Sequence, residues 1–124
     1  MKTIIAGSRG INDIRIIRSA VEESGFIITE VISGTARGVD RLGEVYAKEE
    51  DIPIKRFPAD WDRYGRGSGP RRNAQMAEYG DALIAIWDGE SRGTKSMIDL
   101  AKKAGLRVHV KIVKNNDCDP DMLI

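Results

Sequence analysis

Residues 33–44 (SGTARGVDRLGE) join a strand pattern to a helix pattern through a turn with little side-chain bulk. The apolar pair at 31–32 precedes the turn as the end of a buried strand, and an amphipathic pattern over 39–50 follows it. Gly34 and Gly38 let a ligand approach the backbone, and the helix N-terminus offers unpaired N–H groups and a positive dipole end. This turn is typical of a site for an anion, most often a phosphate.

The same alternation of strand and helix runs through the chain. Apolar runs predict strands at 3–6, 27–32, 52–57, 82–87 and 108–112. Amphipathic patterns predict a helix capped by Asn12 or Asp13 and ended by Gly25, one over 39–50, one over 70–79, and one capped by Thr94 and ended by Gly105. Connections of this length favour right-handed crossovers. We therefore expect an α/β, Rossmann-like three-layer fold with a mostly parallel five-stranded sheet.

The predicted organisation is one domain over residues 1–113, followed by a polar C-terminal tail at 114–124. Residues 58–69 interrupt the alternation with one proline, three glycines and two large aromatics. We expect a loop of about twelve residues here, and long loops in compact domains are often functional.

Composition narrows the possible functions. The formal net charge of +1 argues against a protein held on nucleic acid by bulk electrostatics. The one cysteine, Cys118, excludes an internal disulfide and favours a reducing cytoplasm. His109 is the one histidine, so no His/Cys cluster for zinc is present, and we expect neither a metal nor a cofactor. No signal-peptide pattern or membrane-length apolar run occurs, so we expect no membrane partner.

Three glycine-bearing turns should meet at one edge of the sheet, at 7–9, 33–38 and 93–96. Parallel α/β sheets bind ligands at the carboxyl ends of their strands. Arg71 and Arg72 open a predicted helix, where cations oppose the dipole, which indicates an anion nearby. The candidate contacts are Gly7, Ser8, Arg9, Ser33, Gly34, Thr35, Arg37, Gly38, Asp40, Trp61, Arg71, Arg72, Asn73, Gly93, Thr94 and Lys95.

Several of these residues have a second, structural interpretation. Arg37 contacts the ligand or pairs with Asp40 or Glu44. Trp61 stacks on a base, packs as a small satellite core under the loop, or contacts a second copy of the chain. Lys95 meets a phosphate or is simply exposed.

Four segments carry a family resemblance: 5–9 (IAGSR), 33–40 (SGTARGVD), 57–73 (FPADWDRYGRGSGPRRN) and 91–94 (SRGT). They resemble the YspA-like branch of the SLOG superfamily, which unites DNA-processing protein A with the "lonely guy" phosphoribohydrolases. The resemblance spans roughly residues 3–112. It implies a nucleotide or nucleotide-derived ligand and a homo-oligomer.

The resemblance also bears on catalysis. Phosphoribohydrolase members pair an arginine with a glutamate in a Gly-Gly-x-Gly-Thr-x-x-Glu turn. Arg72 falls at the arginine position, but Met97 stands at the glutamate position, and a thioether cannot act as a general acid or base. Asp40 or Glu44 would have to substitute as the carboxylate.

Three hypotheses follow, in order of preference. The first is a protein that senses or sequesters a nucleotide or ADP-ribose-like ligand, such as a signalling nucleotide in bacterial or phage conflict. The second is a nucleoside-monophosphate phosphoribohydrolase-like N-glycosidase that uses Arg72 with Asp40 or Glu44. The third is a protein that binds single-stranded nucleic acid.

Overall fold

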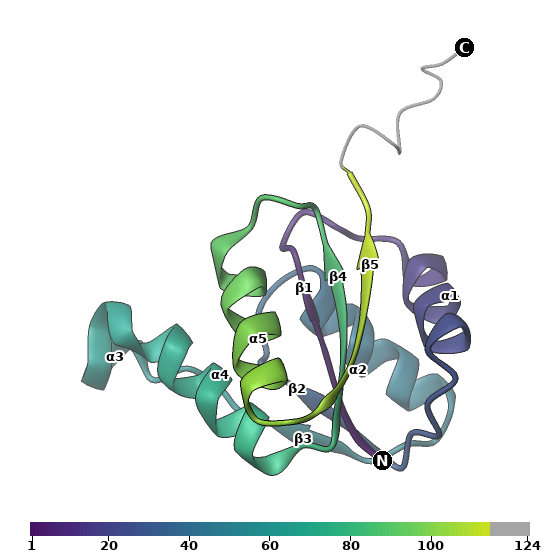
Figure 1. The fold of residues 1–124 in the computed structure, drawn as a ribbon, viewed down its shortest axis with the longest axis horizontal. Helices are drawn as coiled ribbons and strands as arrows, with labels where there is room; N and C mark the ends of the chain where they lie inside the picture. Colours follow the sequence, from purple (N-terminus) through teal and green to yellow (C-terminus); the bar gives the residue numbers. More distant parts are fainter. Residues whose placement is uncertain (115–124) are drawn as a thin grey trace.

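The computed structural model describes residues 1–114. Its strands are β1 (Lys2–Gly7), β2 (Glu30–Ser33), β3 (Ile54–Arg56), β4 (Ala82–Trp87) and β5 (Arg107–Ile112). Its helices are α1 (Ile14–Ser24), α2 (Val39–Glu49), α3 (Trp61–Tyr64), the 3-10 turn η1 (Gly65–Gly67), α4 (Ser68–Tyr79) and α5 (Arg92–Lys103). The strands form one sheet in the order β3-β2-β1-β4-β5, and every neighbouring pair is parallel. The predicted α/β Rossmann-like fold is confirmed (Figure 1).

Helices cover both faces of the sheet because its central strands are apolar at successive positions. Ile4 and Leu83 pack in one core cluster with α4 and α5. Ile5 and Ile84 pack in a second cluster with α1 and α2. Figure 1 accordingly shows α1 and α5 on opposite sides of the sheet. A strand that is buried on both faces reads as a continuous apolar run, and residues 82–86 of β4 are fully buried.

The strand order reverses direction at β1. From β1 the chain proceeds outward to β2 and β3, then returns across the sheet to β4 and continues to β5. The carboxyl ends of β1 and β4 therefore border the crevice where α/β sheets of this type bind ligands.

Two predicted strands are shorter than the sequence pattern suggested. β2 begins at Glu30 rather than at 27, and Ile27 is 79% exposed. The reason is the pairing: Glu30 is opposite Lys2 near the start of β1, and the preceding residues bond instead to the terminal residue Met1. β3 covers only Ile54–Arg56 and lies at an edge of the sheet.

The predicted loop at 58–69 is wrong. This segment contains α3, η1 and the first two residues of α4. The side chain of Asp60 caps α3 by accepting a bond from the backbone of Arg63, and the hydroxyl of Ser68 donates to the carbonyl oxygens of Asp60 and Gly65. These local hydrogen bonds stabilise short helices that carry too few apolar residues for periodicity to reveal.

The predicted helix caps are partly confirmed. Asp13 caps α1, and Gly25 ends it in a left-handed conformation with φ of 70°. Thr94 does not cap α5, because Ser91 does so and the helix begins three residues earlier than the cap assignment implied. The predicted tail lies outside the described residues apart from its first residue, Lys114, and Cys118 falls there as well. Among residues 1–114, no helix has both the length and the apolarity needed to cross a bilayer.

Candidate functional site

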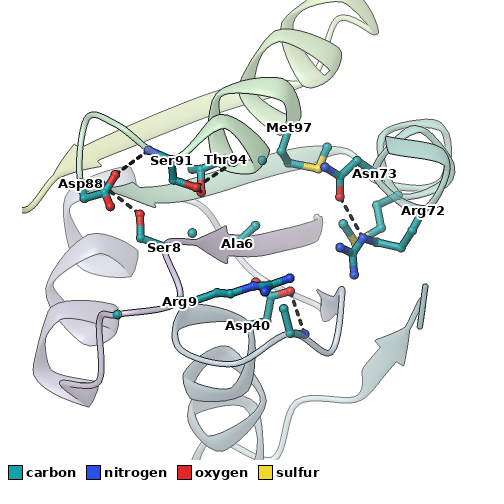
Figure 2. A pocket seen from close by; sticks show the side chains of 15 residues that line it. Ala6, Ser8, Arg9, Asp40, Arg72, Asn73, Asp88, Ser91, Thr94 and Met97 are labelled. Carbon is teal, nitrogen blue, oxygen red and sulfur yellow. Dashed lines mark hydrogen bonds between the residues drawn. The ribbon is translucent and has the colours of Figure 1, made fainter. Parts of the chain in front are cut away.

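A cavity of about 420 Å³ opens at the carboxyl ends of β1 and β4 (Figure 2). Four segments form its wall: the turn after β1, the turn before α2, the middle of α4, and the turn between β4 and α5. Its lining residues are Ala6, Gly7, Ser8, Arg9, Gly10, Ala36, Asp40, Arg72, Asn73, Met76, Asp88, Ser91, Gly93, Thr94 and Met97.

The turn after β1 lies tightly against β4. A Cβ atom on Gly7 would stand 2.0 Å from the carbonyl oxygen of Ile86, so no other residue fits at this position. The backbone N–H of Ser8 donates to that same oxygen at 3.0 Å, and the hydroxyl of Ser8 accepts from the backbone of Asp88 at 3.1 Å. These contacts fix the entrance to the cavity at the point where the strand order reverses.

The turn between β4 and α5 is held by one carboxylate. Oδ1 of Asp88 accepts from the backbone N–H groups of Glu90 and Ser91, each at 2.8 Å. These two bonds hold the pKa of Asp88 below its usual value. Ser91 then caps α5 by accepting from the backbone of Thr94 at 3.4 Å. The N-terminal turn of α5, with Gly93 and Thr94, therefore borders the cavity.

Asp40 is a buried carboxylate in this wall, with 5% of its surface exposed. Its Oδ2 accepts from the backbone N–H of Ala36 at 3.2 Å. Burial raises the pKa of Asp40 from 3.8 to about 6, and the bond from Ala36 and the charge of Arg72 oppose this shift only in part. The carboxyl group therefore titrates near neutral pH.

Arg72 is the cation that reaches the cavity from α4. Its Nε donates to Oδ1 of Asn73 at 2.9 Å, and its Nη1 donates to the carbonyl oxygen of Gly34. Burial lowers the pKa of Arg72, and the like charge of Arg9 lowers it further, while Asp40 raises it. Two guanidinium groups thus share the wall of one cavity with one carboxyl group of raised pKa.

The structure brings half of the candidate contacts together around the cavity: Gly7, Ser8, Arg9, Asp40, Arg72, Asn73, Gly93 and Thr94. The other candidates do not line it: Ser33, Gly34, Thr35, Arg37, Gly38, Trp61, Arg71 and Lys95. Gly38 has a support role, because its φ is 76° and a Cβ there would stand 2.6 Å from the carbonyl oxygen of Ser8. It lets the turn before α2 press against the turn after β1.

Glu44, the other candidate carboxylate, has partners away from the cavity. It accepts from the hydroxyl of Ser33 at 2.6 Å and from Nε of Arg56 at 3.0 Å. Arg37 is exposed, and among residues 1–114 it forms no ion pair with Asp40 or Glu44. The alternative in which Arg37 pairs with Asp40 or Glu44 is therefore not observed.

The remaining candidates have other surroundings. The guanidinium of Arg71 lies 4.0 Å from the ring centroid of Tyr64, and Lys95 pairs with Asp99 at 3.1 Å on the surface of α5. Trp61 is 53% exposed on α3, which Figure 1 shows projecting beyond α4.

Sequence reasoning did not select Met76, Asp88 or Ser91 as site residues. An aspartate directly after a buried strand, followed three residues later by a helix-capping serine, is the signal that would have indicated the last two. Met97 lines the cavity with 1% of its surface exposed, where the family resemblance would place a glutamate. Within residues 1–114, no three His, Cys, Asp or Glu side chains converge as metal ligands do.

The geometry defines a parallel α/β protein with a polar cavity at the reversal point of its strand order. Comparison with known sequences gives the family: residues 1–64 match the family model described as "YspA, cpYpsA-related SLOG family", and the chain belongs to this family. It is also similar to the Gene 61 protein of Mycobacterium phage D29, with 33% identity over 84 residues that cover 63% of this chain and 67% of the phage protein. Membership of the SLOG family suggests the binding or processing of a nucleotide-related ligand.

Proposed function

We propose that this protein binds a nucleotide or an ADP-ribose-like molecule in the cavity at the ends of β1 and β4, and that it senses or sequesters that ligand. The observation that carries the proposal is the convergence of three turns and two guanidinium groups, those of Arg9 and Arg72, on one cavity. Guanidinium groups and helix N-termini both favour phosphate oxygens. A volume of about 420 Å³ lies in the range of small-molecule sites.

The residues that line the cavity favour binding of the ligand without turnover. Met97 occupies the position at which hydrolase relatives carry their glutamate, and it packs in the core with Met76. A buried thioether offers neither a proton nor a charge to a reacting sugar. The cavity thus retains groups that hold an anion and lacks the expected catalytic partner of Arg72.

Native mass spectrometry of the purified full chain, followed by release and identification of any co-purified small molecule, tests the proposal. We expect an intact phosphorylated nucleotide or nucleotide derivative. Titration calorimetry with a panel of nucleoside monophosphates, nucleoside diphosphates and ADP-ribose then ranks the ligands. A protein that purifies without a bound small molecule and binds no member of the panel would contradict the proposal.

One observation favours an enzyme as the second candidate. Asp40 is a buried carboxyl group whose pKa of about 6 suits a general acid or base near neutral pH, and it shares the cavity with Arg72. The activity would be hydrolysis of the N-glycosidic bond of a nucleoside monophosphate, with water adding to the sugar and the base leaving with a proton. Chromatography of the free base measures it. Asp40→Asn should abolish the release, whereas Glu78→Gln, which removes a carboxylate on α4 outside the cavity, should leave it unchanged.

Other parts of the proposal rest on sequence features. Self-association is proposed through α3, where Trp61 is 53% exposed. We also propose a cytoplasmic location, because the single cysteine excludes an internal disulfide. Single-stranded nucleic acid is the least favoured ligand, because the net charge is only +1.

A further inference from the structure

Asp40 is a buried carboxyl group of the cavity wall that has no cation bonded to it. It is 5% exposed, and its Oδ2 accepts a hydrogen bond from the backbone of Ala36 at 3.2 Å. Within residues 1–114, Asp40 and Arg72 form no salt bridge, either with each other or with another side chain. The guanidinium of Arg72 instead donates to the amide oxygen of Asn73 and to a backbone oxygen. Both charged groups of this wall therefore lack an ionic partner.

The groups that act on Asp40 come from three segments of the chain. Burial raises its pKa to about 6, the positive charge of Arg72 on α4 opposes that shift, and the negative charge of Glu44 on α2 adds to it. From the turn after β1, Arg9 lines the same cavity, and in Figure 2 the side chains of Arg9, Asp40 and Arg72 point into it. The other carboxylate of the wall is Asp88, whose bonds from two backbone N–H groups hold its pKa below the usual value. Asp40 is therefore the carboxyl group of the wall that takes up a proton near neutral pH.

That proton changes the net charge of the wall. The charged lining residues are Arg9, Arg72, Asp40 and Asp88. With both carboxylates ionised, the two positive charges are balanced by two negative charges. With Asp40 protonated, one positive charge is left over. An anionic ligand is therefore attracted to the cavity mainly when Asp40 is neutral, and like charges repel more strongly in a partly buried site than in water.

A neutral carboxyl group also changes its hydrogen bonding. An ionised carboxylate can only accept, and so can the oxygens of an ionised phosphate, so the two have no donor to share. A protonated carboxyl group has an O–H that can donate to a phosphate oxygen. A ligand that prefers the protonated form raises the affinity of the site for the proton, and the proton raises the affinity for the ligand by the same factor.

We propose that the cavity binds its anionic ligand together with one proton, and that Asp40 holds this proton beside the ligand. This inference rests on the proposed nucleotide site. It makes the affinity for the ligand depend on pH, so that acidification loads the protein and a rise in pH releases the ligand.

Calorimetric titration of the full chain with ADP-ribose over a range of pH values tests the inference. Each phosphate of ADP-ribose carries one ester bond and shares the bridging oxygen, so neither has a second ionisation near neutral pH. We expect the affinity of the wild type to fall at least about tenfold between about pH 6 and about pH 8, as Asp40 loses its proton. Titration at neutral pH in two buffers of different ionisation enthalpy should show the uptake of most of one proton per ligand.

Asp40→Asn carries a neutral side chain at every pH. We expect this variant to bind ADP-ribose at about pH 8 at least about tenfold more tightly than the wild type does, without pH dependence and without proton uptake. A purely structural role of Asp40 would give weaker binding instead. Asp62→Asn is the matched control, because it makes the same acid-to-amide change on α3 outside the cavity, and it should retain the pH dependence of the wild type.

A wild-type affinity that is the same from about pH 6 to about pH 8, or proton release on binding, overturns the role of Asp40 and leaves the nucleotide site standing. If a nucleoside monophosphate binds and ADP-ribose does not, the difference in proton uptake between the wild type and Asp40→Asn decides, since the phosphate of the ligand ionises in both titrations. Failure to bind any member of the nucleotide panel overturns the proposed function and this inference together. The wild-type pH profile with ADP-ribose decides the matter even if Asp40→Asn does not fold.

Discussion

The guanidinium of Arg72 in α4 donates a hydrogen bond to the backbone oxygen of Gly34, a residue 38 positions earlier in the chain. This bond connects α4 to the turn that follows β2. A Cβ atom on Gly34 would stand 2.8 Å from Nη1 of Arg72 and 2.7 Å from Oδ2 of Asp40. The glycine therefore leaves the space in which a cation and a carboxylate approach the same turn.

Substitution of Arg72 by alanine should weaken nucleotide binding at least about tenfold, because the cavity loses one of its two guanidinium groups. The loss of the bonds to Gly34 and Asn73 should also lower the free energy of unfolding by about 1–3 kcal/mol. Calorimetric titration and urea denaturation measure the two effects. Arg63→Ala removes an arginine that lies over Tyr64, outside the cavity, and should change neither. Unchanged affinity in Arg72→Ala would exclude this side chain from the site.

Substitution of Gly38 by alanine should lower the free energy of unfolding by at least about 1–3 kcal/mol. The residue has a φ of 76°, and an added Cβ would stand 2.5 Å from the carbonyl oxygen of Arg9. The substitution should also disturb the turn after β1 and weaken ligand binding. Gly93→Ala is the comparison for stability: its Cβ meets nothing within 4 Å, so thermal denaturation should show no loss. Equal stability of the two variants would contradict this account of Gly38.

The stability of the protein should depend on pH through Asp40. Burial raises the pKa of this group to about 6 in the folded state, so the folded protein binds its proton more tightly than the unfolded chain does. The stability supplied by that proton is fully present below the ordinary value of 3.8 and is lost as the pH rises through about 6. A difference of two pKa units corresponds to about 3 kcal/mol at most.

Urea denaturation of the wild type and of Asp40→Asn at a series of pH values measures this contribution. The unfolding free energy of the wild type, relative to that of the variant, should fall as the pH is raised from about 4 to about 7. Parallel pH profiles for the two proteins would show that Asp40 has an ordinary pKa.

Self-association through α3 should be weakened by Trp61→Ala. A half-exposed tryptophan on a projecting helix offers a large apolar surface for burial against a second copy. Light scattering across a range of protein concentrations should show a smaller mean mass for the variant. Ile27→Ala, at the most exposed large apolar residue of the described part of the chain, should leave the mass unchanged. A wild type that is monomeric throughout would refute the oligomer.

The sequence predicted the parts of the fold that local periodicity controls. Residues 82–87 are apolar throughout because β4 is buried on both faces, and Asp13 and Gly25 mark the ends of α1 because capping is a local interaction. Prediction from the sequence failed where strand pairing or capping partners determined the secondary structure. Ile27 looks like part of a strand but lies before the pairing of β2 with β1 begins. The segment 58–69 looks like a loop because its helices rely on polar bonds.

For the site, the sequence by itself determined which turns would meet. A βα alternation with glycines after the strands leads to a parallel sheet, and such a sheet gathers its turns at one edge. Only the tertiary structure decided which side chains face the cavity. Asp40 and Glu44 are four residues apart in α2, yet one is buried in the cavity wall and the other is bound by Ser33 and Arg56. Whether a carboxylate faces water, a cation or a cavity depends on residues distant in the chain. The local spacing of residues in the sequence contains no information about these distant contacts.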